Sequence, residues 1–217
     1  MKTPRSIIPA LAALLLAWLP QAHARNINWS SGVGDIFLQA DGVTAMDSSF
    51  GFELGGFTTG FTPTQANFSL WQSNWIVFDT ANTGTAEWSP GVGYYSSTGM
   101  TVAAAGSTVT SSITGATFTI GQQAYLWAFN TKTIGASTQW AMIANTAWTY
   151  PASDPFNPND LLWDLQDPAN TAVAGATSVD TVNFVATLQA QPVPEPGSAL
   201  LVALAGVLIR LRRRYGR

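Results

Sequence analysis

The chain has no cysteine, and its one histidine, His23, lies near the N-terminus. The body that follows therefore carries neither a thiol nor an imidazole side chain. Their absence excludes Ser-His-Asp and Cys-His nucleophilic sites, zinc sites built from thiolate or imidazole ligands, and haem held by histidine. It also leaves the fold without disulfide bonds, even in a compartment that permits them.

Positive charge is scarce in the body of the chain. Between residues 25 and 196 only Arg25 and Lys132 are basic, whereas all twelve acidic residues lie there, so this part has a net charge of −10. Such an acidic surface repels phosphate backbones, which disfavours nucleic-acid binding. With two cations, the body also has no cluster of basic side chains to hold a phosphate group or an oxyanion.

The first 24 residues have the three-part pattern of a secretory signal. Lys2 and Arg5 precede an apolar stretch from Ile7 to Leu19, and Ala22 and Ala24 are small residues at the positions that signal peptidase reads. We therefore expect a signal helix over residues 1–24 that is cut after Ala24. The alternative is an uncleaved N-terminal anchor, but the apolar stretch is short for a membrane span of about 20 residues.

The last segment, residues 192–217, combines a proline-rich start, an apolar run and a basic end. The apolar run from Gly197 to Leu211 has 15 residues, or about 22 Å as a helix, which is short of a hydrocarbon core of about 30 Å. Arginine side chains can lengthen its reach and stay on the cytoplasmic side. We expect a short transmembrane helix with the body outside. The basic residues are Arg210, Arg212, Arg213 and Arg214.

Pro194, Glu195 and Pro196, followed by the apolar run and the arginines, resemble the PEP-CTERM sorting domain. The resemblance implies that an exosortase-like membrane enzyme recognises the Pro-Glu-Pro motif and removes the tail, much as a glycolipid-anchor signal is removed. It also implies an inner-membrane precursor that moves on to the cell surface or matrix, in a setting of extracellular polysaccharide and biofilm. The alternative is an ordinary single-pass anchor.

Residues 25–191 show short segments of alternating apolar and polar residues separated by turn residues. About nine or ten strands are expected, which favours one all-β domain of β-sandwich or jelly-roll-like architecture. Residues 123–130 are expected to form a central strand. Further strands are expected at 36–40, 50–54, 75–78, 92–102, 140–143 and 181–188.

One short helix is expected near residue 160. Asn157 is a suitable N-cap, Pro158 suits the first turn, and Asp160 favours the N-terminal dipole. In that helix Leu161, Leu162 and Leu165 would face inward.

Three rings, Tyr125, Trp127 and Phe129, fall on one face of the predicted central strand. An exposed row of rings can stack on sugars, because each ring offers an apolar face while polar groups at its rim satisfy hydroxyls. Aromatic residues are also favoured inside sheets, and we expect this face to belong to the core. The ligand platform is the alternative.

Two groups of acidic residues are weaker candidates for chemistry. Asp154, Asp160 and Asp164 lie in an oxygen-rich stretch that could hold calcium, but the spacing fits no EF-hand loop, and a solvated loop with local turns is the expectation. A glycosidase needs two carboxylates about 5–10 Å apart. Glu53 and Glu87 are the only glutamates before Glu195, and the sequence does not fix their separation.

The sequence therefore predicts an exported, non-enzymatic surface or matrix protein that needs no cofactor and no resident metal. Its expected partners are signal peptidase, an exosortase-like enzyme and the membrane that holds the tail before processing. The alternative is a module that binds exopolysaccharide, and a weaker alternative is a glycoside hydrolase or lyase. Nucleic acid is not an expected partner.

Overall fold

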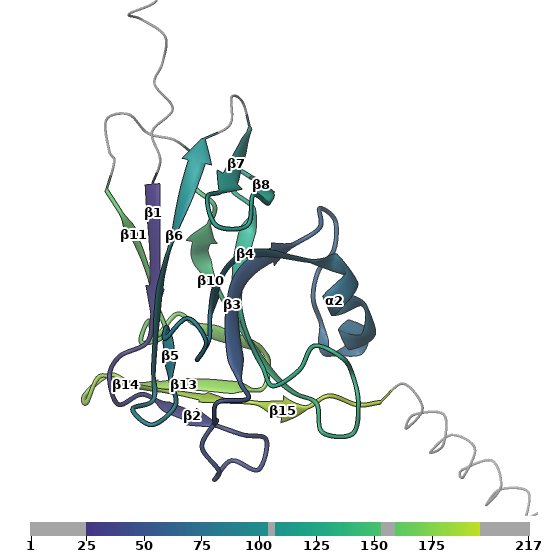
Figure 1. Ribbon diagram of the computed structural model, residues 1–217, viewed down its shortest axis with the longest axis vertical. Helices are drawn as coiled ribbons and strands as arrows, with labels where there is room; N and C mark the ends of the chain where they lie inside the picture. The colour runs from purple at the N-terminus through teal and green to yellow at the C-terminus, as the bar shows by residue number, and fades with distance from the viewer. Residues whose placement is uncertain (1–24, 104–106, 153–158, 196–217) are drawn as a thin grey trace, which may run out of the picture.

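The computed structural model describes residues 25–103, 107–152 and 159–195. These residues form three β-sheets and two short helical segments, so the body is all-β as the sequence predicts (Figure 1). In the part of the chain that the structure describes, no helix has both the length and the apolar character to cross a membrane. The predicted signal helix and the predicted C-terminal helix lie outside the described residues.

The first sheet has the strand order β11-β1-β6-β7-β8, with β5 paired to β6. Its pairs are antiparallel except for β1 and β11, which run parallel. The strands are β1 (Arg25–Ser30), β5 (Trp88–Ser89), β6 (Tyr94–Ala103), β7 (Thr108–Ser111), β8 (Thr117–Thr119) and β11 (Leu161–Asp164).

The second sheet has the order β12-β10-β9-β3-β4, with β15 paired to β10, and all its pairs are antiparallel. The predicted central strand at 123–130 is confirmed, because β9 lies in the middle of this order. The strands are β3 (Gly51–Phe57), β4 (Trp75–Ala81), β9 (Gln123–Phe129), β10 (Gln139–Thr149), β12 (Thr171–Ala174) and β15 (Gln191–Pro192).

A small third sheet lies across the lower end of the other two (Figure 1). It has the order β13-β14-β2 and consists of β13 (Ala176–Asp180), β14 (Val185–Gln189) and β2 (Ile36–Leu38). Strands β14 and β2 run parallel. Phe37 and Leu188 of this sheet are buried in the main core, so the sheet closes one end of it.

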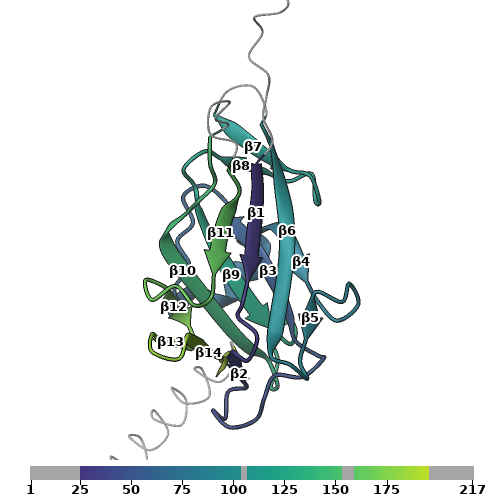
Figure 2. The ribbon, with the colours of Figure 1, turned by 90° about the vertical axis from the view of Figure 1, so that its left-hand side faces the viewer.

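The main core lies between the first and second sheets, which form two layers in Figure 2. Alternate residues of each strand point into it, as the two-residue period of a strand requires. The first sheet contributes Ile27, Trp29, Tyr95, Val109, Phe118 and Trp163, and the second contributes Phe52, Leu54, Phe78, Leu126 and Ile143.

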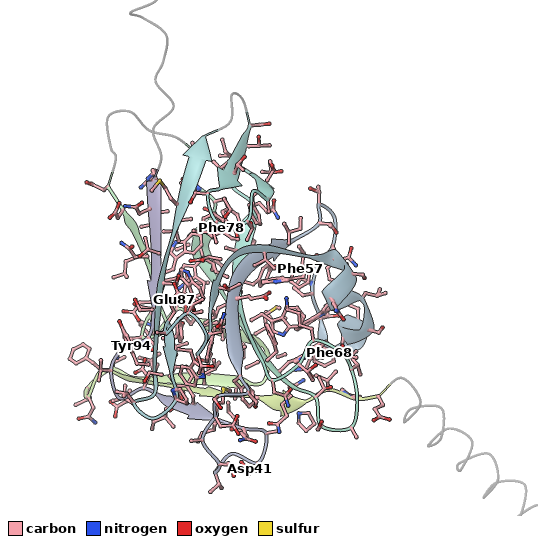
Figure 3. All side chains as sticks on the ribbon, viewed as in Figure 1. Asp41, Phe57, Phe68, Phe78, Glu87 and Tyr94 are labelled. Atoms are coloured by element: carbon pink, nitrogen blue, oxygen red, sulfur yellow. The ribbon has the colours of Figure 1, made fainter. Side chains whose placement is uncertain are left out.

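A short helical segment covers the opposite face of the second sheet. It consists of η1 (Gln65–Leu70) and α2 (Trp71–Asn74), which connect β3 to β4 (Figures 1 and 3). Asn67 fixes the start of this segment, because its side-chain oxygen accepts hydrogen bonds from Thr64 N and from Trp71 Nε1, each at 2.8 Å. The second sheet is thus buried on both faces where this segment lies.

The predicted helix near residue 160 is wrong. Leu161–Asp164 form strand β11, which pairs with β1, while Asn157 and Pro158 lie outside the described residues. The spacing of the leucines fits a helix, but Trp163 is buried and Leu162 is exposed, which is the alternation of a strand. The edge of β1 offers backbone hydrogen bonds to this segment, and this pairing favours a strand over a helix.

The predicted strand over residues 181–188 is correct only in its second half. Residues 181–184 form the turn between β13 and β14, and Val182 and Phe184 are exposed. Asp180 makes this turn, because its carboxylate accepts hydrogen bonds from Val182 N and Asn183 N. More strands form than the nine or ten expected, since the described residues include strands up to β15.

Candidate functional site

The strand β9 separates two kinds of side chain. Ala124, Leu126 and Ala128 point into the main core, whereas Tyr125, Trp127 and Phe129 point to the other face, beneath the helical segment. Trp127 is fully buried, with none of its surface exposed, and Tyr125 and Phe129 are half-buried. The expectation that this face belongs to the core is confirmed for Trp127, and an exposed platform of three rings is excluded.

Trp127 belongs to a second buried cluster, which we call the outer aromatic cluster. Trp71 of α2 stacks on Trp140 of β10, with ring centroids 5.7 Å apart, and Trp140 meets Trp127 edge to face at 4.8 Å. Both are preferred arrangements of aromatic pairs. The cluster comprises Phe57, Phe68, Trp71, Trp127, Trp140, Met142, Ala174 and Val193; Figure 3 shows Phe57 and Phe68 on the side of α2.

An ion pair lies beside this cluster. Lys132 Nζ is 2.6 Å from Glu53 Oε2, which also accepts a hydrogen bond from Trp75 Nε1 at 2.7 Å. The Lys132 ammonium lies 4.9 Å from the ring centroid of Phe129 and 5.6 Å from that of Trp127, within cation–π range. One of the two cations of the body therefore neutralises a nearly buried carboxylate.

Tyr125 and Phe129, at the two ends of the row, each line a separate pocket. The first pocket, of about 430 Å³, is lined by residues 57–62, residues 119–123 and Tyr125; we call it the threonine pocket. Burial raises the pKa of Tyr125 above its ordinary value, which keeps the phenol neutral. The second pocket, of about 300 Å³, contains Phe129 and Glu53 in its lining. The predicted ring row thus contributes to two surfaces rather than one.

A second nearly buried carboxylate lies between the two large sheets. Asp79 Oδ2 accepts hydrogen bonds from Trp29 Nε1 at 2.7 Å and from Ser97 Oγ at 2.8 Å. Burial raises the pKa of Asp79, and these hydrogen bonds oppose the rise. Ser97 Oγ is also 3.0 Å from Glu87 Oε1, but a hydroxyl has one proton, so it donates to one of the two carboxylates at a time.

Glu53 and Glu87, the pair considered for a hydrolase, point to different places. Glu53 points away from the main core toward Trp75 and Lys132, whereas Glu87 bonds Ser97 of the first sheet. They share no hydrogen-bond partner among the described residues. The structure instead brings Glu87 close to Asp79, through the single hydroxyl of Ser97.

The calcium candidates are only partly described. Asp154 lies outside the described residues. Asp160 is exposed, and Asp164 accepts a hydrogen bond from Gln166 N at 2.9 Å. No group of three or more acidic or histidine side chains suited to a metal occurs within residues 25–103, 107–152 and 159–195.

Most residues of the addressing segments lie outside the described part of the chain, namely Ala22, Ala24, Pro196, Arg210, Arg212, Arg213 and Arg214. The described fold extends to Val193, two residues past the expected boundary at residue 191. Val193 is buried in the outer aromatic cluster, and its N–H donates to Thr138 O at 3.0 Å. Pro194 and Glu195, which follow directly, are exposed.

Sequence reasoning missed the ion pair, the Asp79 cluster and the threonine pocket. One signal pointed to the ion pair, because Lys132 is one of only two cations in an acidic body. Asp79 gave a similar signal, as a carboxylate within the predominantly apolar segment Trp75–Ala81. Residues 57–62 show only turn chemistry in the sequence, and their role as a pocket wall depends on contacts with residues distant in the chain.

Comparisons with protein-family models, with curated proteins and with solved structures found no match to this chain. The function is therefore argued from the residues and the geometry of this molecule.

Proposed function

We propose that this protein is an exported, non-enzymatic surface or matrix protein whose C-terminal tail is recognised and removed by an exosortase-like membrane enzyme. The observation that carries the proposal is the order Pro194-Glu195-Pro196, apolar run, arginine cluster at the C-terminal end of the sequence. The body is of the β-sandwich class in this proposal, because two large sheets enclose one core.

The position of the motif relative to the fold supports this proposal. Val193 is anchored by burial and by its hydrogen bond to Thr138, and exposed Pro194 and Glu195 come immediately after it. Proline cannot donate a backbone hydrogen bond, so such a segment does not continue a strand. A processing enzyme needs an accessible peptide, and the first two residues of the motif, Pro194 and Glu195, are exposed.

Arg25, the first residue of the expected mature chain, is held in the fold by hydrogen bonds. Strand β1 begins at Arg25, whose backbone N donates to Thr101 Oγ1 at 3.2 Å and whose guanidinium donates to Asn159 O at 3.0 and 3.1 Å. Cleavage after Ala24 would keep these contacts of Arg25 in the mature chain. The absence of cysteine and histidine from residues 25–196 supports a role without thiol or imidazole catalysis.

The test follows an epitope tag fused to the C-terminus in cells that carry the cognate exosortase. The wild-type protein should lose the tag, and mass spectrometry should place its ends at Arg25 and near Pro196. Replacing Pro194, Glu195 and Pro196 by alanine should leave a tagged precursor in the inner membrane. Deleting residues 210–217 should reduce processing, because the arginines hold the tail in one orientation.

The control is Pro168→Ala, which changes an exposed proline outside the motif and should be processed like the wild type. A mature surface protein that still carries the tag would show that the tail is an ordinary anchor and would refute the sorting proposal.

A further inference from the structure

The walls of the threonine pocket are connected by hydrogen bonds within the fold. Its two walls, residues 57–62 and residues 119–123, are joined by the side chain of Gln122. Gln122 Nε2 donates to Phe57 O at 2.8 Å, and its Oε1 accepts from Thr119 N at 2.9 Å. A pocket that is already formed costs little ordering on binding, and a volume of about 430 Å³ lies in the range of small-molecule sites.

The pocket combines aromatic surface with hydroxyl groups. Tyr125 and Phe61 are half-buried, so part of each ring remains accessible in the lining. The hydroxyls of Thr59, Thr62 and Tyr125 make no hydrogen bond to any described residue. A ligand can therefore pack an apolar face on a ring and form hydrogen bonds with these hydroxyls. A sugar makes both kinds of contact, because it has an apolar face and several hydroxyl groups.

The lining of the threonine pocket contains no charged side chain. The body as a whole carries a net charge of −10, which repels anionic polymers. The smaller pocket at the other end of the β9 row differs, because Glu53 belongs to its lining. Of the two pockets, the threonine pocket is therefore the one suited to an uncharged ligand.

The geometry points to the threonine pocket as a binding site for an uncharged saccharide unit. The apolar face of the sugar packs on the Tyr125 ring, and its hydroxyls bond the Tyr125 phenol and the hydroxyls of Thr59 and Thr62. This site uses one ring of the β9 row and the loop after β3. It is independent of the sorting proposal, since it lies within the folded body and involves no residue of the tail.

The experiment is isothermal titration calorimetry of the full chain, purified in a detergent without a sugar headgroup. The probes are the neutral oligosaccharides cellohexaose, mannohexaose and chitohexaose, and the acidic hexagalacturonate. We expect binding of at least one neutral probe and none of hexagalacturonate. Tyr125→Phe keeps the ring and its contact with Phe57, 5.4 Å between centroids, and should weaken binding about fivefold through loss of one hydrogen bond.

Thr62→Val should weaken binding by a similar factor, since it removes an exposed hydroxyl and keeps the shape of the side chain. The matched control is Tyr94→Phe, which removes the phenol of another half-buried tyrosine outside the pocket and should bind like the wild type. Melting temperatures of all variants should equal that of the wild type.

Three outcomes would overturn the proposal: no binding of any neutral probe, tighter binding of hexagalacturonate, or unchanged affinity in both Tyr125→Phe and Thr62→Val. Failure of the sorting proposal has a separate signature, the retained C-terminal tag, so the two proposals fail independently.

Discussion

The two faces of the second sheet solve the same packing problem with different side chains. Toward the first sheet, β9 presents Ala124, Leu126 and Ala128, and toward the helical segment it presents Tyr125, Trp127 and Phe129. Neighbouring large rings such as Phe52, Phe78 and Trp29 already fill the space between the sheets. On β9 the small side chains therefore face a space that rings of neighbouring strands fill, and the large ones face the space beneath the short helical segment.

Each face also buries one carboxylate, with different partners. Asp79, on the inner face, is held by the neutral donors Trp29 Nε1 and Ser97 Oγ, whereas Glu53, on the outer face, is held by Trp75 Nε1 and the Lys132 ammonium. Burial of a charge is costly unless it is paired or well hydrogen-bonded. The outer carboxylate uses charge pairing, and the inner one uses hydrogen bonds alone.

The largest effect is expected from removing the ring at the centre of the outer face. Trp127→Ala should lower the free energy of unfolding by about 3–5 kcal/mol, through lost burial and the cavity left behind. The measurement is urea denaturation followed by circular dichroism. Stability equal to the wild type would mean that Trp127 does not fill the buried space beneath the helical segment. The comparison of the two faces would then be wrong for the outer face.

A smaller change at the same site tests whether the packing or the indole N–H matters. Trp127 Nε1 is buried without a hydrogen-bond partner among the described residues, whereas Trp140 Nε1 donates to Thr131 O at 2.6 Å. Trp127→Phe removes an unsatisfied donor, which offsets part of the lost burial. Trp140→Phe is the matched control and should cost about 1–3 kcal/mol more, because it leaves Thr131 O unpaired.

The inner face could be predicted from the sequence far better than the outer one. Alternation of apolar residues in segments such as 50–54 identifies strands and one buried face, because it depends only on the two-residue period. The cover of the outer face depends on where residues 58–74 fold, and no local pattern determines that. For the same reason the Glu53–Lys132 pair, between residues 79 positions apart, could not be read from the sequence.

Removing the cation tests how the outer carboxylate is held. Lys132→Met leaves Glu53 with Trp75 Nε1 as its one donor among the described residues and should lower the free energy of unfolding by about 1–3 kcal/mol. The double variant Glu53→Gln with Lys132→Met should recover most of this loss, because no buried charge remains unpaired. Arg25→Met, which removes the other cation of the body, is the control and should change stability by less than about 1 kcal/mol.

If Lys132→Met alone is as stable as the wild type, charge pairing does not hold the outer carboxylate, and the contrast between the two faces disappears. A double variant as unstable as the single one would instead show that the Lys132 ammonium acts through its cation–π contacts with Phe129 and Trp127.

The smallest expected effect concerns the inner carboxylate and appears in the pH dependence of stability. Because burial raises the pKa of Asp79 above its ordinary value of 3.8, the folded protein holds this proton more tightly than the unfolded chain does. The contribution of Asp79 to stability is therefore fully present below pH 3.8 and is lost as the pH rises through the raised pKa. In Asp79→Asn this titration is absent. The variant also loses the hydrogen bond from Thr80 N, which contributes about 1 kcal/mol to the free energy of unfolding.

The variant Asp79→Asn should therefore be less stable than the wild type at low pH, and this loss of stability should shrink as the pH rises from 3.8 through the raised pKa of Asp79.

The pH dependence expected for Asp41 is the opposite, because hydrogen bonds from Thr44 and Val43 lower its pKa. Its contribution is present above pH 3.8 and is lost as the pH falls through the lowered pKa. In Asp41→Asn the deficit should therefore grow as the pH rises. The measurement is the melting temperature of each variant against pH, and parallel curves for the two variants would contradict the difference in pKa between these carboxylates.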